Sequence, residues 1–319
     1  MKQVSAFFRV MRWPNLVFII ITQLMFHFCI VVPSAHGHVY NFPLRLTTPL
    51  LLLLCFSSIC IAAAGYIIND YFDINIDEVN KPHKMVVGRS LSRRWALFWH
   101  LVLSAIGLII GGYVSMKLGN WVIAIANGAC VILLWVYSTT FKRQLLIGNL
   151  VISALTAWVI LVLLVAELPG WWTGELVSDT EKATVARLSR IGILYAAFAF
   201  ILSLIREVIK DMEDIDGDRK EGCHTMPIEW GMQASKVFAG VWLVVLIVTL
   251  LVTQVYVLQF GWWLSPVYIL LFVIIPLVLI FKKLPAAKQV GHFAKLSKML
   301  KWVMLLGIIS MMFFLLYTH

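Results

Sequence analysis

Residues 48–77 read TPLLLLLCFSSICIAAAGYIINDYFDINID, and this stretch sets the class of protein to which the chain belongs. Residues 48–68 carry no charged side chain, and a helix of that length crosses a hydrocarbon layer about 30 Å thick. Three aspartates, Asp70, Asp73 and Asp77, follow directly. The stretch therefore predicts a membrane-spanning helix that ends in a group of carboxylates at the membrane surface.

The rest of the chain is composed in the same way. Of its 319 residues, 61% are hydrophobic and only 13% are charged, which is too apolar for a water-soluble globular protein. Apolar runs bounded by charges or by Pro and Gly predict nine spans, at residues 14–33, 48–68, 95–115, 120–138, 147–167, 190–210, 235–255, 263–281 and 299–317. We therefore predict an all-α integral membrane protein in which residues 1–319 form a single membrane domain.

Positive charge is distributed unevenly between the two sides that these spans define. Most of the 26 Lys and Arg residues fall on the side that holds the N-terminus, including six lysines between Lys282 and Lys301, which we interpret as topology signals that can attract anionic membrane lipids. The other side holds only Arg45, Lys117, Lys182, Arg187 and Arg190. Because cytoplasmic loops carry such an excess, we expect a multi-pass protein of the cell (inner) membrane with a cytoplasmic N-terminus. The formal net charge of +10 then encodes topology, and we expect no nucleic-acid partner.

The spacing Asp-x-x-Asp-x-x-x-Asp occurs a second time, at Asp211, Asp214 and Asp218, where the sixth span ends. Four spans separate the two copies, so both are expected on the cytoplasmic side. In a helix, positions i, i+3 and i+7 fall within an arc of about 60°. A single copy is compatible with a solvated acidic helix end, but two copies on one membrane face indicate a shared site.

Carboxylates this close to one another repel and need a cation. Six aspartates at the bilayer centre would cost on the order of 15 to 20 kcal/mol, so we expect them in a hydrated cavity near the membrane surface. Oxygen ligands without His or Cys suit Mg²⁺, which shares its coordination shell with water and substrate phosphates. Two facing motifs would therefore hold a diphosphate through magnesium ions.

Both motifs resemble those of the UbiA-type intramembrane prenyltransferases. Residues 69–77 (NDYFDINID) with residues 80–82 (NKP) are similar to the first motif of that superfamily, and residues 206–218 (REVIKDMEDIDGD) to the second. The similarity is closest to the branch that includes digeranylgeranylglyceryl phosphate synthase, and it extends to residues 12–15 (RWPN), 137–138 (YS), 142–143 (KR) and 148–149 (GN). Residues 81–88 (KPHKMVVG) differ from the Arg-Pro-x-Pro pattern that is usual in this branch, so the resemblance leaves the acceptor open.

The resemblance implies a nine-helix UbiA-like bundle with an active-site cavity at its cytoplasmic side. It implies transfer of an isoprenyl group from a polyprenyl diphosphate to a lipophilic acceptor, with Mg²⁺ as cofactor and geranylgeranylglyceryl phosphate or a related glycerol phosphate lipid as the favoured acceptor. The metal site would comprise Asn69, Asp70, Asp73, Asp77, Asp211, Asp214 and Asp218, of which Asp70, Asp73, Asp211 and Asp214 would be catalytic. The substrate-binding residues would be Asn15, Lys81, Tyr137, Ser138, Lys142, Arg143, Arg206 and Lys210.

Several alternatives are compatible with parts of this pattern. The same fold could prenylate a quinone or an aromatic acceptor. An ion-coupled transporter also carries intramembrane carboxylates, but usually near the bilayer midplane, and a CDP-alcohol phosphotransferase needs an Ala-Arg pair that residues 214–222 lack. Lys210 could pair with Asp214 instead of a phosphate, and Lys142 and Arg143 could be topology signals. The sequence indicates no obligate protein partner.

Overall fold

The computed structural model describes residues 7–35, 44–80, 82–83, 85–168 and 179–317. Within these residues, nine helical segments are long and apolar enough to cross a membrane, and each overlaps one predicted span. They are Trp13–Ala35, Thr48–Phe72, Arg93–Leu118, Trp121–Thr139, Ile147–Glu167, Lys182–Lys220, Gly231–Leu258, Leu264–Lys283 and Val290–Tyr317. The predicted number and order of spans are therefore confirmed.

Three of these segments are built from consecutive helices, and six are single helices. The first segment combines α2 (Trp13–Met25), the π-helix η1 (Phe26–Val31) and α3 (Val32–Ala35), the eighth combines α13 (Leu264–Ile269), the π-helix η3 (Leu270–Ile274) and α14 (Ile275–Lys283), and the ninth combines α15 (Val290–Ile309) and α16 (Met312–Tyr317). The single helices are α4 (Thr48–Phe72), α6 (Arg93–Leu118), α7 (Trp121–Thr139), α8 (Ile147–Glu167), α10 (Asp179–Lys220) and α12 (Gly231–Leu258). Short connecting helices are α5 (Ile74–Asn80), the 3-10 helix η2 (Phe141–Arg143) and α11 (Met226–Glu229).

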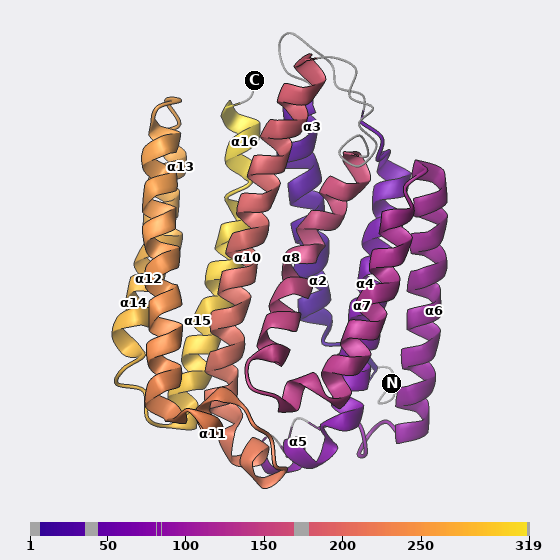
Figure 1. The fold of residues 1–319 in the computed structure, drawn as a ribbon, viewed down its shortest axis with the longest axis vertical. Helices are drawn as coiled ribbons and strands as arrows, with labels where there is room; N and C mark the ends of the chain where they lie inside the picture. Colours follow the sequence, from indigo (N-terminus) through magenta and orange to yellow (C-terminus); the bar gives the residue numbers. More distant parts are fainter. Residues whose placement is uncertain (1–6, 36–43, 81, 84, 169–178, 318–319) are drawn as a thin grey trace.

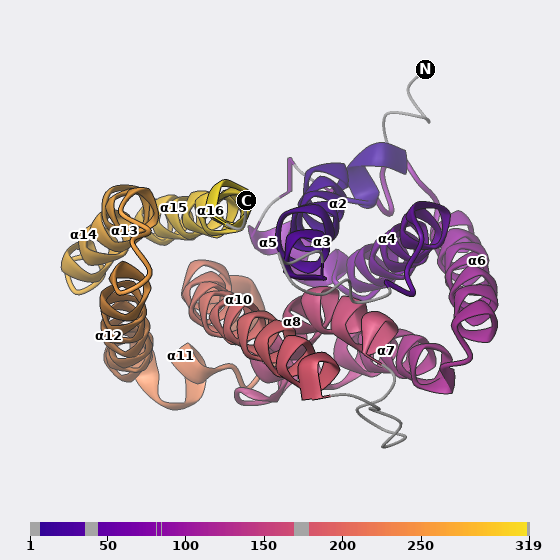
Figure 2. The ribbon, with the colours of Figure 1, turned by 90° about the horizontal axis from the view of Figure 1, so that it is seen from above.

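The helices form a ring. α2 packs against α4, α4 against α7, α7 against α8, α8 against α10, α10 against α15, and α15 against α2, and Figure 2 shows these helices around a common centre. α6 covers α4 and α7 from outside, and α12 and α14 flank α10 and α15. α5 and α11 both lie at the same end of the bundle (Figure 1). The ends of α4 and α10 that carry the Asp motifs therefore lie at the same end of the ring.

Close contact between α4 and α6 depends on small residues. A Cβ atom on Gly107 would lie 2.7 Å from Ile61 Cγ1, and Ser57 Oγ donates a hydrogen bond to the Gly107 carbonyl oxygen at 2.7 Å. Membrane helices pack in this way because lipid provides no hydrophobic force between them, so close contact and hydrogen bonds hold them together. The outward faces are apolar instead, with Ile109 and Ile125 each 71% exposed, as expected for surfaces that contact lipid.

The two Asp motifs differ in backbone structure. α10 continues through the whole second motif, as the predicted stripe of carboxylates requires. α4 ends at Phe72 instead, Asp73 occupies its C-cap, and α5 begins at Ile74. The first motif is therefore not one continuous helix, because the chain turns at Asp73 to bring α5 against α10.

Candidate active site

Asn80, at the end of α5, joins the two Asp motifs. Its Nδ2 donates to the carbonyl oxygen of Asp214 at 2.9 Å, and the backbone N–H of Gly217 donates to its Oδ1 at 2.9 Å. A Cβ atom at position 217 would lie 2.4 Å from Asn80 Nδ2, so a glycine is needed for this close approach. One side chain thus fixes α5 against the second motif on α10.

A cavity of about 1400 Å³ lies between the helices of the ring. From the end that carries the motifs it extends past Thr156 and Ser203, whose hydroxyl oxygens are 3.2 Å apart, to the aromatic side chains of Tyr195 and Phe314. All six motif aspartates line it: Asp70, Asp73, Asp77, Asp211, Asp214 and Asp218. The structure therefore brings the two motifs to one cavity, which is lined by carboxylates and basic side chains at one end and is largely apolar along the rest of its length.

Cations from two other elements pair with two of the three aspartates of the first motif. Arg12, which precedes α2, places Nη2 2.6 Å from Asp70 Oδ1. Lys142, in η2, forms an ion pair with Asp73 Oδ2, which also accepts a hydrogen bond from Asn69 Nδ2 at 2.6 Å. Burial alone would lower the pKa of Arg12 and of Lys142, but the adjacent carboxylates outweigh burial and raise both values. Both side chains therefore stay positively charged at the motif.

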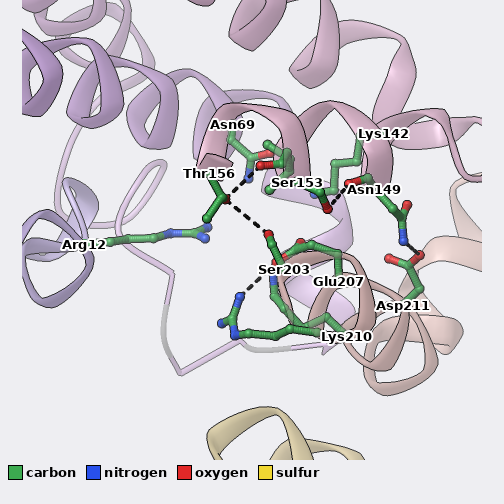
Figure 3. A network of polar contacts seen from close by, with 12 residues as sticks. Arg12, Asn69, Lys142, Asn149, Ser153, Thr156, Ser203, Glu207, Lys210 and Asp211 are labelled. Atoms are coloured by element: carbon green, nitrogen blue, oxygen red, sulfur yellow. Dashed lines mark hydrogen bonds and ion pairs between the residues drawn. The ribbon is translucent and has the colours of Figure 1, made fainter. Parts of the chain in front are cut away.

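The second motif is held from α8 (Figure 3). Asn149 Nδ2 donates to Asp211 Oδ2 at 2.7 Å, and Ser153 Oγ donates to the carbonyl oxygen of Asn149 at 2.6 Å. Asn149 belongs to a segment that resembles the UbiA-type enzymes, but the sequence did not single it out as a site residue. Its role becomes visible only when α8 packs against α10.

Glu207 is the centre of a charge cluster that the sequence did not single out. Its carboxylate accepts hydrogen bonds from Arg206 Nη1 at 2.8 Å and from Lys210 Nζ at 3.0 Å. Lys210 therefore forms an ion pair with Glu207, which lies one turn before it in α10. Glu207 lines the cavity, and Figure 3 shows the side chain of Arg12, which precedes α2, extending toward the group of residues around Glu207. The four-residue spacing from Glu207 to Asp211 is the signal that could have revealed it, since such residues share one helix face.

The other predicted substrate-binding residues fall into three groups. Asn15 and Tyr137 line the cavity. Ser138 and Arg143 are not part of the described cavity wall, because Ser138 is buried and donates to its own helix, and Arg143 is exposed. Lys81 lies outside the described residues.

The residues present fit a hard divalent cation that is bound together with a substrate. Within the described residues, no three His, Cys, Asp or Glu side chains come close enough to hold an ion alone. Mg²⁺ needs no such cage, since it binds through one or two carboxylates and completes its shell with water and phosphate oxygens. Asn69 Oδ1 is buried at the motif without a hydrogen-bond partner in the described part of the chain. Burial, and then the charges of Asp73 and Asp70, raise the pKa of Asp77 to about 6. A bound cation would offset these charges and favour the ionised carboxylate.

Residues 30–299 match the UbiA prenyltransferase family, and the chain belongs to this family. A digeranylgeranylglyceryl phosphate synthase of Methanosphaera stadtmanae is 28% identical over 294 residues, which cover 90% of this chain and 93% of that protein. A solved structure of a digeranylgeranylglyceryl phosphate synthase has a TM-score of 0.59 at 24% identity and covers 98% of this chain and 99% of its own. A UbiA homologue from Archaeoglobus fulgidus, bound to DMAPP and Mg²⁺, has a TM-score of 0.56 at 16% identity, with 96% and 98% covered. The predicted UbiA-like fold is therefore confirmed.

Proposed function

We propose that this protein transfers a prenyl group from a prenyl diphosphate to a hydroxyl group of a glycerol phosphate lipid, with geranylgeranylglyceryl phosphate as the favoured acceptor. The observation that carries this proposal is that both Asp motifs line one cavity whose remaining length is largely apolar. A substrate with a diphosphate head and an isoprenoid tail likewise has one charged end and a long apolar part. The similarity to a digeranylgeranylglyceryl phosphate synthase over 90% of the chain supports this acceptor over a quinone or an aromatic compound.

Magnesium, when bound, would offset the charge of both motifs and stabilise the negative charge that develops on the leaving diphosphate. The residues proposed to hold it are Asn69, Asp70, Asp73, Asp77, Asp211, Asp214 and Asp218, and catalysis is proposed to depend most on Asp70, Asp73, Asp211 and Asp214. The Archaeoglobus fulgidus homologue, which binds DMAPP with Mg²⁺, supports a divalent ion in this fold.

The basic side chains at the first motif act on the donor. In the transfer, the bond between C1 and the diphosphate oxygen breaks, its electron pair leaves with the diphosphate, and the acceptor oxygen bonds to C1 and loses its proton. Arg12 and Lys142 lie on the aspartates where the diphosphate is proposed to bind. Positive groups already fixed where negative charge develops lower the barrier, because they need not reorganise during the reaction. Asn15 and Tyr137 are proposed to line the bound substrates.

We also propose the orientation and the extent of the working unit. The nine apolar helical segments within the described residues, together with the family, make the chain a multi-pass integral membrane protein. The excess of Lys and Arg on the side of the motifs favours a cavity that faces the cytoplasm and a cytoplasmic N-terminus, in the cell membrane. The ring draws helices from both halves of the chain, which supports residues 1–319 acting as one domain.

The proposal is tested with purified protein, geranylgeranyl diphosphate, Mg²⁺ and separate acceptors. The acceptors are geranylgeranylglyceryl phosphate, a hydroxybenzoate and a dihydroxynaphthoate, and product masses are measured against an Asp70→Asn control. We expect a product one geranylgeranyl group heavier with the glycerol phosphate lipid only. Transfer to an aromatic acceptor alone would refute the acceptor, and a metal-independent product or equal activity in the control would refute the mechanism.

A further inference from the structure

Lys301 of α15 has a position that a topology signal does not explain. It lines the cavity, donates to Asn15 Oδ1 at 2.7 Å, and lies over the ring of Phe18, with Nζ 5.0 Å from the ring centroid. Both partners are uncharged. An ammonium group within a membrane-spanning segment is unfavourable unless an anion or water compensates it. The cavity is therefore where a counter-charge for Lys301 is expected.

Arg206 and Lys210 on α10 bring two more cations to the same cavity. Both bind the carboxylate of Glu207, and Arg206 lies close enough to Lys301 for the two charges to repel. Arg206 Nε is buried and has no hydrogen-bond partner in the described part of the chain. Arg206 and Lys210 share the carboxylate of Glu207, whereas the hydrogen bond of Lys301 goes to an uncharged amide, so the basic wall, formed by Arg206, Lys210 and Lys301, carries three positive charges against the one negative charge of Glu207.

The basic wall adjoins the acidic one on α10 and extends away from it. At 100° per residue, Glu207, Asp211, Asp214 and Asp218 fall within about 60° of one another around α10, whereas Lys210 lies about 40° and Arg206 about 80° beyond Asp214, on the side away from Asp211. The Asp211 carboxylate accepts from Asn149 of α8, and the backbone of the second motif is bonded by Asn80 of α5. The charge of Arg206 acts on Lys301 of α15, a helix that also packs against α10.

We propose that the basic wall is the subsite for the phosphate monoester of the acceptor. The inference rests on the proposed function and adds to it the place where the acceptor headgroup binds. A phosphate monoester carries about −1.5 to −2 charges at pH 7, which matches the net charge of the wall, and its oxygens form strong hydrogen bonds with guanidinium and ammonium groups. A neutral quinol would leave the wall uncompensated.

This arrangement also solves a problem of charge. The donor diphosphate and the acceptor phosphate are both anions, and they repel if they share one set of cations. Placing the diphosphate on the acidic wall and the monoester on the basic wall keeps them apart while both substrates remain in one cavity. The acceptor hydroxyl group then lies between the two walls, on the side of the donor C1 atom.

The test compares a phosphorylated acceptor with its neutral alcohol. Lys301→Met removes the charge and keeps the aliphatic length, and Lys295→Met is the matched control, because Lys295 is exposed on the same helix and is not in the cavity wall. We expect Lys301→Met to lower kcat/KM for geranylgeranylglyceryl phosphate about 10- to 100-fold, the effect of one hydrogen bond to a charged group. With geranylgeranylglycerol, and in the KM for the donor, the change should stay within about twofold. Arg206→Gln should act in the same direction, and Lys301→Arg should restore most of the activity.

Different failures have different meanings. An equal loss with both acceptors, or a raised KM for the donor in place of the acceptor, would overturn the phosphate subsite. A wild-type protein that does not prenylate the glycerol phosphate lipid would overturn the proposed function itself, before any variant is made. If Lys301→Met is less stable than Lys295→Met, the other two variants decide. A loss with the phosphorylated acceptor alone in Arg206→Gln, together with near-normal activity in Lys301→Arg, would support the subsite. An equal loss with both acceptors in Arg206→Gln would refute it.

Discussion

Replacing Asn80 and Gly217, alone and together, tests whether one side chain holds the two Asp motifs in register. Gly217 lies inside α10, where alanine in place of glycine stabilises a helix by about 1 kcal/mol. Here the added Cβ would lie 2.4 Å from Asn80 Nδ2 and 2.8 Å from its Oδ1, so the side chain must move and both of its hydrogen bonds at 2.9 Å are lost. Two such bonds contribute about 1 to 3 kcal/mol. Gly217→Ala should therefore destabilise the wild type by about 0 to 2 kcal/mol, but stabilise the Asn80→Ala variant by about 1 kcal/mol.

Thermal unfolding in detergent of the wild type, the two single variants and the double variant measures this change of sign. A change of 1 kcal/mol shifts Tm by about 2 to 4 °C for a protein of 150 to 250 residues. Gly128→Ala on α7 is the matched control, because a Cβ there meets nothing within 4 Å. Prenyl transfer should fall by up to about 100-fold in both single variants, because a shift of about 1 Å between the motifs misplaces the donor. If Gly217→Ala changes Tm equally in both backgrounds, Asn80 does not occupy this space. Full activity in Asn80→Ala would show that other contacts align the motifs.

Asp70→Asn and Asp214→Asn should each abolish prenyl transfer, because an amide cannot offset a cation, while Tm stays within a few degrees of the wild type; near-normal turnover in either variant would contradict the metal assignment. EDTA should stop the reaction and added Mg²⁺ should restore it. Because burial, and then Asp73 and Asp70, raise the pKa of Asp77 to about 6, the metal-free protein binds this proton more tightly than the unfolded chain does, and it should lose stability as pH rises from about 4 to about 6. The same carboxyl must ionise to bind a cation, so the Mg²⁺ concentration for half-maximal activity should be higher at about pH 5.5 than at about pH 7.5, and an unchanged value would exclude Asp77 from the metal site. Lys142→Met should raise KM for the prenyl diphosphate about 10- to 100-fold through loss of one charged contact, and an effect on the acceptor alone would show that Lys142 does not contact the donor.

The spans and the pairing of the motifs could be predicted because both follow from constraints that act along the sequence. An apolar run must match the thickness of the bilayer, and an even number of spans between two copies of a motif places them on one face. The break at Asp73 could not be predicted in this way. It allows α5 to reach α10, and the contact is made by Asn80 with a carbonyl group 134 residues further along the chain.

The charges of the site illustrate a second limit of sequence reasoning. Lys301 lies near the end of a span, where a basic residue satisfies the topology rule whether it faces lipid headgroups, water or the cavity. Only the packing of α15 against α2 distinguishes these cases, through a hydrogen bond between residues 286 positions apart. A site for anionic substrates therefore adds cations to its own side of the membrane and strengthens the apparent topology signal.

The topology signal can be separated from the substrate site by counting only the Lys and Arg residues that do not line the cavity. On the side of the motifs, the wall contains Arg9, Arg12, Lys142, Arg206, Lys210, Lys298 and Lys301, and on the other side Arg187 and Arg190. Without them, the 282–295 segment alone still supplies Lys282, Lys283, Lys288 and Lys295, more than the Arg45, Lys117 and Lys182 that remain on the opposite side. The excess that favours a cytoplasmic cavity therefore does not depend on the residues that bind substrate, so Lys301→Met should alter acceptor recognition without changing the orientation of the protein in the membrane.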